Sequence, residues 1–414
     1  MAAVDQPIRG RPWLRLASRG PIAAGYVLAV LAFFEGTARL VLRSETYFQR
    51  ISGNDDATWR HRWLKRRGSQ PHLSYSFDVF DPGRGWALKP GIRDARPWAE
   101  ATLNTNSRGL RGSAEYDYRK PPGRIRILAF GDSFTFGEEV SDHETWPRRL
   151  EELIPGAQVL NFGVHGYGHD QMLVYLQQEG VKYQADVVLL GFLFDDMERN
   201  LLSFRDYAKP RFAIEGDRLA LKDSPVPSPQ QVLSREPYRS KLADLFTMLI
   251  ARRRERTGEA GERMQHLTLR ILDEFHRTVQ SMGARTGFAY LPVYGEIDKP
   301  DMAMTRREMF FFQHCRRQGI QSMYLRRFFR DRLRRGVEFK TYGHWGPLEH
   351  QTTAEGIAAY LIEKGLIPQI SGIRKSDEVR SPGSPVSFAW SRRVEPSVRR
   401  PRTLFIQTSP PPST

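Results

Sequence analysis

Apolar and polar residues alternate along most of the chain in blocks whose lengths are typical of strands and helices. Short apolar runs of the strand type are RILAF, QVLNF, ADVVLLGFLF and, at 288–293, FAYLPV. Between them lie stretches with apolar residues at three- and four-residue spacing, such as DQMLVYLQQEG and ERMQHLTLRILDEFHRTVQSMG, and this spacing predicts helices. Strands that alternate with helices predict βαβ units, and therefore a parallel sheet with helices on both faces.

The N-terminal region follows a different pattern. Residues 1–20 form a polar, basic segment, and the stretch PIAAGYVLAVLAFFEGTARLVL at 21–42 has no charge in its first two-thirds. About 20 apolar residues span a bilayer, and Glu35 and Arg39 are spaced to pair on one helical face. We predict a transmembrane signal anchor at 21–43, with a cleaved signal peptide or an amphipathic surface helix as the alternatives. The arginines that precede the stretch favour an N-terminus on the inside of the membrane, although the arginines that follow weaken this bias.

The rest of the chain divides into three regions by composition. Residues 44–120 are rich in turn residues and aromatics, and we expect a loop-rich lead-in packed on the main domain. Residues 121–370 carry the strand and helix patterns of that domain, and 204–240, which contains SPVPSPQQ, predicts an excursion on its surface. Residues 371–414 are rich in Ser, Pro and Arg and are expected to be disordered, because such a composition buries little apolar surface.

Charge and cysteine content narrow the possible partners. The formal net charge is +16, but the arginines are scattered and no DNA- or RNA-binding motif accompanies them. We therefore expect no nucleic-acid partner. Cys315 is the single cysteine, so no intrachain disulfide can form. No HExxH-like or Cys-rich cluster suggests a metal site, and we expect neither a metal nor another cofactor.

The first candidate for chemistry lies in the stretch RIRILAFGDSFTFGEEV at 124–140. Its apolar run ends at the turn residues Gly131 and Asp132, and Ser133 follows directly. Open parallel sheets bind ligands outside the carboxyl ends of their strands. Ser133 is therefore a candidate nucleophile, and its alternative role is that of a helix cap.

Three further stretches lie at corresponding places. NFGVHGYGHDQ ends a strand and contains Gly163, Gly166 and Gly168, whose backbone N–H groups can approach a ligand closely. GFLFDDMERN ends another strand with two carboxylates, and YGHWGPLEHQTTAEGIAAYL puts His344 just before a helix. Taken singly, these patterns are typical of a tight turn, a helix N-cap and core packing. Their joint placement with Ser133 favours one site.

With these blocks in order, the chain resembles the SGNH (GDSL-type) hydrolase family, specifically its bacterial membrane-anchored branch. The resemblance rests on GDSFTFG, NFGVHGYG and GHWGPLEH, and also on DPGRGWALKPG, NTNSRGLRG and LVYLQQEG, between about residues 78 and 365. It implies a flavodoxin-like three-layer α/β/α sandwich around a central, mostly parallel sheet. It also implies that Ser133 is the nucleophile, that His344 is the general base, and that the N–H groups of Ser133 and Gly163 form the oxyanion hole.

The chain departs from this family's pattern at the third block. The family has an Asn whose side chain donates to the oxyanion, whereas this chain has Asp195. An ionised carboxylate only accepts hydrogen bonds, and the loss of one such donor costs roughly 10²–10³ in rate. Asp195 could keep the role only by staying protonated, for example by sharing a proton with Asp196.

The second departure lies beside the histidine. Where the family commonly has an acid just upstream, as in Asp-Gly-His-Trp, this chain has Tyr342. Losing the carboxylate that orients a catalytic histidine can cost roughly 10⁴ in rate. Glu338, Asp331 or Asp195 are the candidates to replace that acid near His344.

Two functions follow from these observations. The first is a serine esterase or O-acyltransferase that acts on an acyl ester of cell-envelope polysaccharide or lipid. It would be anchored in the bacterial inner membrane by a single span, with its globular domain outside the cytoplasm. The second is a catalytically impaired envelope protein of the same fold, with a binding or scaffolding role.

Overall fold

The structure is a computed structural model that describes residues 12–66, 73, 75–98, 100–298, 303–340 and 342–367, with side chains from residue 23 onward. The predicted tail at 371–414 and the first 11 residues lie outside the described part.

Five strands form the central sheet. They are β5 (Ile125–Gly131), β6 (Ala157–Gly163), β7 (Val187–Phe192), β12 (Arg285–Tyr290) and β13 (Gln321–Tyr324). Every neighbouring pair is parallel, and the strands lie in the order β13-β12-β7-β5-β6. Numbered along the chain, this is the 2-1-3-4-5 order of flavodoxin-like sheets. The predicted fold class is confirmed.

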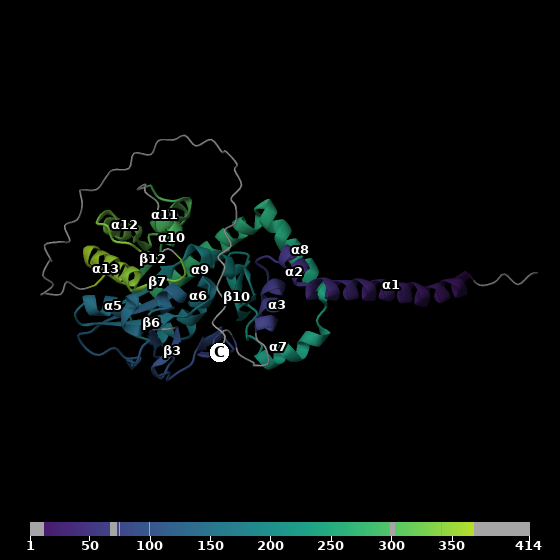
Figure 1. Cartoon of the computed structure of the whole chain (residues 1–414), viewed down its shortest axis with the longest axis horizontal. Coiled ribbons are helices and arrows are strands. Elements are labelled where there is room, and N and C mark those ends of the chain that lie inside the picture. The colour runs from purple at the N-terminus through teal and green to yellow at the C-terminus, as the bar shows by residue number, and fades with distance from the viewer. Residues whose placement is uncertain are drawn as a thin grey trace, which may run out of the picture.

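Each face of the sheet is covered by helices. Along β5, Ile127 and Ala129 pack into one apolar cluster while Leu128 and Phe130 pack into the other, because successive strand residues point to opposite faces. The first cluster is closed by α5 (Trp146–Leu153), α12 (Arg326–Arg334) and α13 (Pro347–Glu363). The second is closed by α6 (His169–Gln178), α9 (Glu259–Ser281) and α11 (Arg306–Arg317) (Figure 1). The result is a three-layer α/β/α arrangement.

The segment before the sheet is built from small elements. These are α2 (Glu45–Ile51), α3 (Asp56–Arg66) and two antiparallel hairpins, β1 (Asp78–Asp81) with β2 (Gly85–Leu88) and β3 (Ala95–Trp98) with β4 (Ala101–Leu103). Trp86 and Leu103 are completely buried, in the same apolar cluster as Phe130 of the sheet.

The predicted surface excursion at 204–240 is only partly correct. It contains the hairpins β8 (Phe204–Arg205) with β9 (Tyr207–Ala208) and β10 (Arg211–Glu215) with β11 (Arg218–Lys222), followed by α7 (Pro229–Arg235). Tyr207 is completely buried, with its ring centroid 5.3 Å from that of Trp63. Aromatic residues near the start of the segment therefore join the core, although its Pro-rich part has the composition of a loop.

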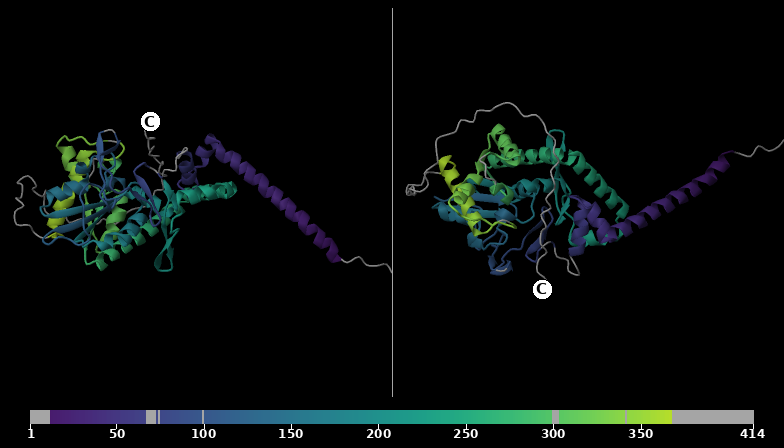
Figure 2. Two further views of the ribbon diagram at one scale, coloured as in Figure 1. Left: turned by 90° about the horizontal axis from the view of Figure 1, so that it is seen from below. Right: turned by 45° about the horizontal axis from the view of Figure 1, so that its top comes forward.

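A long helix, α1 (Pro12–Arg43), projects from the globular part (Figures 1 and 2). Its portion Ala23–Arg43 is long and apolar enough to cross a membrane or to act as a signal sequence. Arg39 Nη2 lies 2.9 Å from Glu35 Oε1, which is the predicted pair. The base of α1 packs against α8 (Lys241–Thr257). Other short elements are η1 (Asp142–Glu144), η2 (Gly180–Lys182), η4 (Glu236–Tyr238) and α10 (Tyr294–Ile297).

Candidate active site

Ser133 is the first residue of the short helix α4 (Ser133–Phe136), which follows β5 directly. The residue that caps this helix is Asp132, whose Oδ1 accepts a hydrogen bond of 3.0 Å from the backbone N–H of Phe134. The capping role weighed for Ser133 therefore belongs to its neighbour. Strand β5 lies between β6 and β7, where the strand order changes direction, and open sheets of this type bind ligands at such a point.

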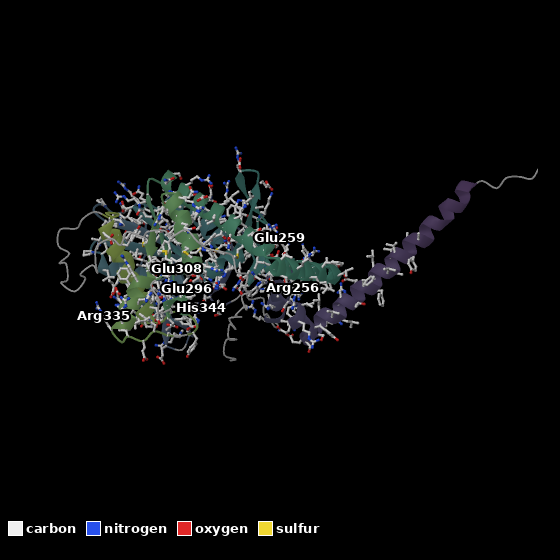
Figure 3. All side chains as sticks on the ribbon, turned by 90° about the horizontal axis from the view of Figure 1, so that it is seen from above. Arg256, Glu259, Glu296, Glu308, Arg335 and His344 are labelled. Carbon is white, nitrogen blue, oxygen red and sulfur yellow. The ribbon has the colours of Figure 1, made fainter. Side chains whose placement is uncertain are left out.

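His344 reaches Ser133 from the loop before α13. Its Nε2 lies 2.9 Å from Ser133 Oγ. The backbone of His344 is held from two sides: the Tyr294 hydroxyl donates to its carbonyl oxygen at 2.8 Å, and the next residue, Trp345, is completely buried with its ring 5.1 Å from that of Phe134. Figure 3 labels His344 in the globular part of the chain. The structure thus brings together the two predicted catalytic side chains.

Glu139 is the acid that faces this histidine, and the sequence pattern did not identify it. Its Oε1 lies 3.4 Å from His344 Nδ1, and its Oε2 lies 2.6 Å from Lys340 Nζ. The backbone of Glu139 is left-handed, with φ of 69°, two residues after the left-handed Gly137 that ends α4. A residue other than glycine is disfavoured in this region, and such strain is concentrated at functional sites. Here the turn directs a carboxylate at the histidine.

A second carboxylate, Glu138, lies on the serine side of the imidazole. Its Oε2 is 3.6 Å from His344 Nε2, and its Oε1 accepts a hydrogen bond of 2.7 Å from the hydroxyl of the partly buried Tyr75. The imidazole therefore lies between two acids, while its Nε2 still contacts the serine hydroxyl.

The contacts between His344 and the two acids shift the pKa values of His344 and Glu139. Burial lowers the pKa of His344, but the hydrogen bond that Nδ1–H donates to Glu139 and the negative charges of Glu138 and Glu139 outweigh this effect, so the pKa is raised above its usual value. The hydrogen bond with His344 lowers the pKa of Glu139 to about 2, and the contact with Lys340 also lowers it. Glu139 is therefore ionised at neutral pH and stabilises the protonated imidazole.

The acids proposed from the sequence lie elsewhere. Asp195 Oδ1 is 2.8 Å from Arg307 Nη1, in a surface pair with the Asp195 side chain 38% exposed. Asp331 pairs with Arg334, and Glu338 is exposed to solvent. Within the described residues, none of the three acids contacts the histidine. Glu139 takes the place that they were expected to fill.

Asp196, rather than Asp195, points toward the Ser133 turn. Both lie in η3 (Phe194–Leu201), directly after β7. Asp196 is completely buried, with its Oδ1 2.7 Å from Arg199 Nη1, and the same Nη1 lies 3.5 Å from Asp132 Oδ2. Burial raises the pKa of Asp196 well above its usual value, and the nearby Asp132 adds to the rise. Arg199 therefore links this third strand end to the residue that precedes Ser133.

The backbone donors near Ser133 also differ from the expectation. Among the described residues, the Ser133 N–H donates to no protein acceptor. The Gly163 N–H is occupied, since it donates to Asn161 Oδ1 at 2.9 Å. A Cβ on Gly163 would lie only 2.2 Å from the backbone nitrogen of Phe136. Gly163 therefore allows β6 to pack closely on α4, and its N–H is not free for an oxyanion.

Gly166, in the same block, differs from Gly163 in the state of its backbone N–H. Its φ of 71° is left-handed, and its N–H has no acceptor within the described part of the chain. The turn that contains it lies beside the site: the Val164 N–H donates to the Gly131 carbonyl at 3.2 Å, and the His165 ring lies 6.2 Å from that of Phe136. The three-glycine pattern was the signal in the sequence, but it did not distinguish which glycine has a free N–H.

We expect Asp195→Asn to change kcat/KM for a short ester by no more than about two-fold, because a surface ion pair contributes little and the amide would lie away from Ser133. The measurement is p-nitrophenyl acetate hydrolysis by the purified variant, with Arg307→Gln as the matched change on the other side of the pair. A change of tenfold or more in kcat/KM for Asp195→Asn, without a similar change for Arg307→Gln, would show that Asp195 belongs to the active site.

We expect Gly163→Ala to lower the free energy of unfolding by about 3 kcal/mol, since a side chain forced into a filled space costs this much and the blocking atoms belong to the α4 backbone. Thermal unfolding followed by circular dichroism measures the change. The control is Gly261→Ala in α9, where the added carbon meets no atom within 4 Å. Equal melting temperatures for both variants would show that the contact with α4 is less tight.

No protein-family model matches this chain, and no curated protein matches its sequence. Solved structures with a similar fold include a member of the lipolytic protein G-D-S-L family from Veillonella parvula (11% identity, TM-score 0.35, covering 58% of this chain and 97% of that one). Others are a putative G-D-S-L lipolytic protein from Desulfitobacterium hafniense (11%, 0.35, 57% and 100%) and a mutant acetylxylan esterase from Geobacillus stearothermophilus (11%, 0.33, 57% and 94%). At this degree of similarity the likenesses identify no activity, substrate or site residue in this chain.

Proposed function

We propose that this chain is a serine-dependent ester hydrolase or O-acyltransferase. The observation that carries the proposal is the contact of 2.9 Å between Ser133 Oγ and His344 Nε2, with Glu139 on the other ring nitrogen. A serine hydroxyl becomes a nucleophile when a base within hydrogen-bond reach removes its proton, and the base works best when a third group orients it. All three groups lie at the strand end where ligands bind in this fold.

The geometry supports a two-step reaction. His344 Nε2 removes the Ser133 proton while Oγ attacks the ester carbonyl, and the Ser133 N–H, with the Gly166 N–H as our proposed second donor, stabilises the oxyanion. Glu139 stabilises the imidazolium, which then gives its proton to the departing alkoxide. His344 next deprotonates a water or an acceptor alcohol. That oxygen attacks the acyl-serine and releases an acid or a new ester, and the proton returns to Ser133.

The test of this function is hydrolysis of p-nitrophenyl acetate by the full chain in detergent, with and without a soluble acceptor alcohol. A serine esterase releases p-nitrophenol and acetate, whereas an acyltransferase forms the acetylated acceptor in a yield that rises with acceptor concentration. Absence of both products from the wild-type chain would contradict the proposal.

The second candidate is a non-catalytic envelope protein, and one observation still favours it. Asp195, at the position where the family has the Asn donor, pairs with Arg307 on the surface and supplies no donor to the oxyanion. The other departure from the family pattern is Tyr342, which replaces the usual acid upstream of the histidine. This departure does not favour the second candidate, since Glu139 is an acid that faces His344. The same hydrolysis assay separates the two candidates.

The substrate and location are proposed from α1. An apolar helix with a basic N-terminal flank favours a single-span anchor with the active site outside the cytoplasm. Esters of cell-envelope polysaccharide or lipid are the acyl donors or acceptors available at that surface.

We expect proteinase K, added to spheroplasts of a Gram-negative host that expresses the chain, to digest the globular domain. In inside-out inner-membrane vesicles the same domain should resist digestion, because the vesicle encloses it. Detergent-permeabilised spheroplasts serve as the control for intrinsic sensitivity. Complete protection in intact spheroplasts would reverse the proposed orientation.

A further inference from the structure

We propose that one face of α8 lies on an anionic phospholipid bilayer next to α1, so that the domain touches the membrane at a second place besides its anchor. The proposal rests on the proposed anchoring of α1, and it does not depend on the ester chemistry. Figures 1 and 3 show α8 at the end of the globular part from which α1 projects.

The outward face of α8 is apolar. Phe246, Leu249 and Ile250 are 57%, 47% and 47% exposed, and their spacing of three and four residues places them on one side of the helix. The inward side buries Asp244 and Met248. A soluble helix normally presents its polar face to water, whereas α8 presents three large apolar side chains there. A contiguous exposed apolar patch of this kind marks a contact surface.

Contacts with α1 place the beginning of α8 at the level of the membrane helix. The Glu35 carboxylate accepts hydrogen bonds from the Ser240 hydroxyl and from the backbone N–H groups of Lys241 and Leu242, at 2.8–3.0 Å. Leu40 lies five residues further along α1, about 7.5 Å in a helix, and is still 69% exposed. An exposed apolar side chain of α1 thus lies past the point where α8 starts, so a bilayer that covers Leu40 also reaches α8.

Basic side chains accompany the apolar face. Arg253, Arg254 and Arg256 are exposed in the last two turns of α8, and Figure 3 labels Arg256 there. An open cleft of about 470 Å³ beside the start of α8 is lined in part by Arg235 and Arg239, and Arg235 forms no ion pair with the described residues. Apolar residues flanked by arginines are the signature of a helix that lies in the interface of an anionic membrane.

A second copy of the chain fits this face less well. A symmetric pair would bring the same arginines together across the contact, and like charges that face each other oppose association. Lipid phosphates have the complementary charge, and the proposed anchoring of α1 in the bilayer brings them close to α8.

The experiment uses the full chain reconstituted at one copy per nanodisc, in phosphatidylcholine with or without phosphatidylglycerol. An environment-sensitive NBD dye is attached at Leu249→Cys, and the matched control is Val181→Cys in η2, a site 41% exposed on the globular part. The native Cys315 is completely buried, so each variant presents one accessible thiol. Emission wavelength and quenching by doxyl-labelled lipid report whether the dye is in the bilayer.

We expect the dye at Leu249→Cys to emit at shorter wavelength and to be quenched at least two-fold by doxyl lipid, while the dye at Val181→Cys stays in water. Quenching should rise with phosphatidylglycerol, and the triple change Arg253→Gln, Arg254→Gln and Arg256→Gln should remove that rise. A dye at Leu249→Cys that is as water-exposed as the control would overturn the proposal, and so would shielding seen only in discs with two copies. Ester hydrolysis is measured on the same discs, and its presence or absence does not affect the test of α8.

Discussion

Replacing Ser133 with alanine is expected to slow p-nitrophenyl acetate hydrolysis by about 10⁴-fold or more, because loss of the nucleophile removes the covalent step and leaves only binding and the oxyanion donors. The hydroxyl contacts His344 at 2.9 Å and Asp132 at 3.3 Å, and the cap of α4 belongs to Asp132. The variant should therefore fold normally. Initial rates, with circular dichroism on the same samples, measure both quantities.

The matched control for this loss is Ser234→Ala, which removes an exposed hydroxyl that bonds only the local carbonyl of Gln231. Its hydrolysis rate should equal that of the wild type. A Ser133→Ala variant that retains more than about a tenth of the wild-type rate would contradict a nucleophilic role, since removal of a nucleophile lowers the rate by far more than this.

Glu139→Gln is expected to lower kcat/KM on the order of 10²-fold, less than the roughly 10⁴-fold loss seen when a buried orienting carboxylate is replaced. The contact to His344 Nδ1 is 3.4 Å long and the Glu139 side chain is partly exposed, so a smaller effect follows. The amide keeps the size of the side chain and its left-handed backbone, but it no longer stabilises the imidazolium.

The same variant should shift the pH profile in a defined direction. The base must be neutral His344, so the rate falls as pH drops through its pKa, which the two acids raise above its usual value. Without the charge of Glu139 that pKa falls, and the acid limb of kcat/KM moves to lower pH. Lys340→Gln should move it the opposite way, since Lys340 is the cation that pairs with Glu139.

Glu338→Gln and Asp331→Asn are the controls for this acid, because both side chains lie away from the histidine. Neither should alter the rate or the pH profile. If Glu338→Gln reproduces the loss, or if Glu139→Gln leaves rate and profile unchanged, then Glu139 does not orient His344.

The sequence predicted the parts of the site that depend on local patterns. Strand β5 is buried at every position, so its apolar run stands out, and Gly131 and Asp132 mark its end. Parallel strands gather their carboxyl ends at one edge of the sheet, and this rule predicts that Ser133 lies near the other blocks. His344 could be added because its block precedes the last helix.

The acid could not be predicted in the same way. Glu139 and His344 are 205 residues apart along the chain, and they meet because the turn after α4 takes a left-handed conformation that a glutamate seldom adopts. In the family pattern the orienting acid lies just upstream of the histidine. In this chain the acid is Glu139, which lies shortly after Ser133. In η3, similarly, sequence could not show that Asp195 points to Arg307 while Asp196 points inward.

The most direct test of the central claim, that Ser133 is a nucleophile activated by His344, is the site of covalent labelling by a fluorophosphonate probe. The full chain is labelled in detergent, digested and analysed by mass spectrometry, together with Ser133→Ala and His344→Gln. We predict one adduct, on Ser133, that is absent from Ser133→Ala and forms far more slowly in His344→Gln. An adduct on another serine, or equal labelling of wild type and Ser133→Ala, would contradict the assignment.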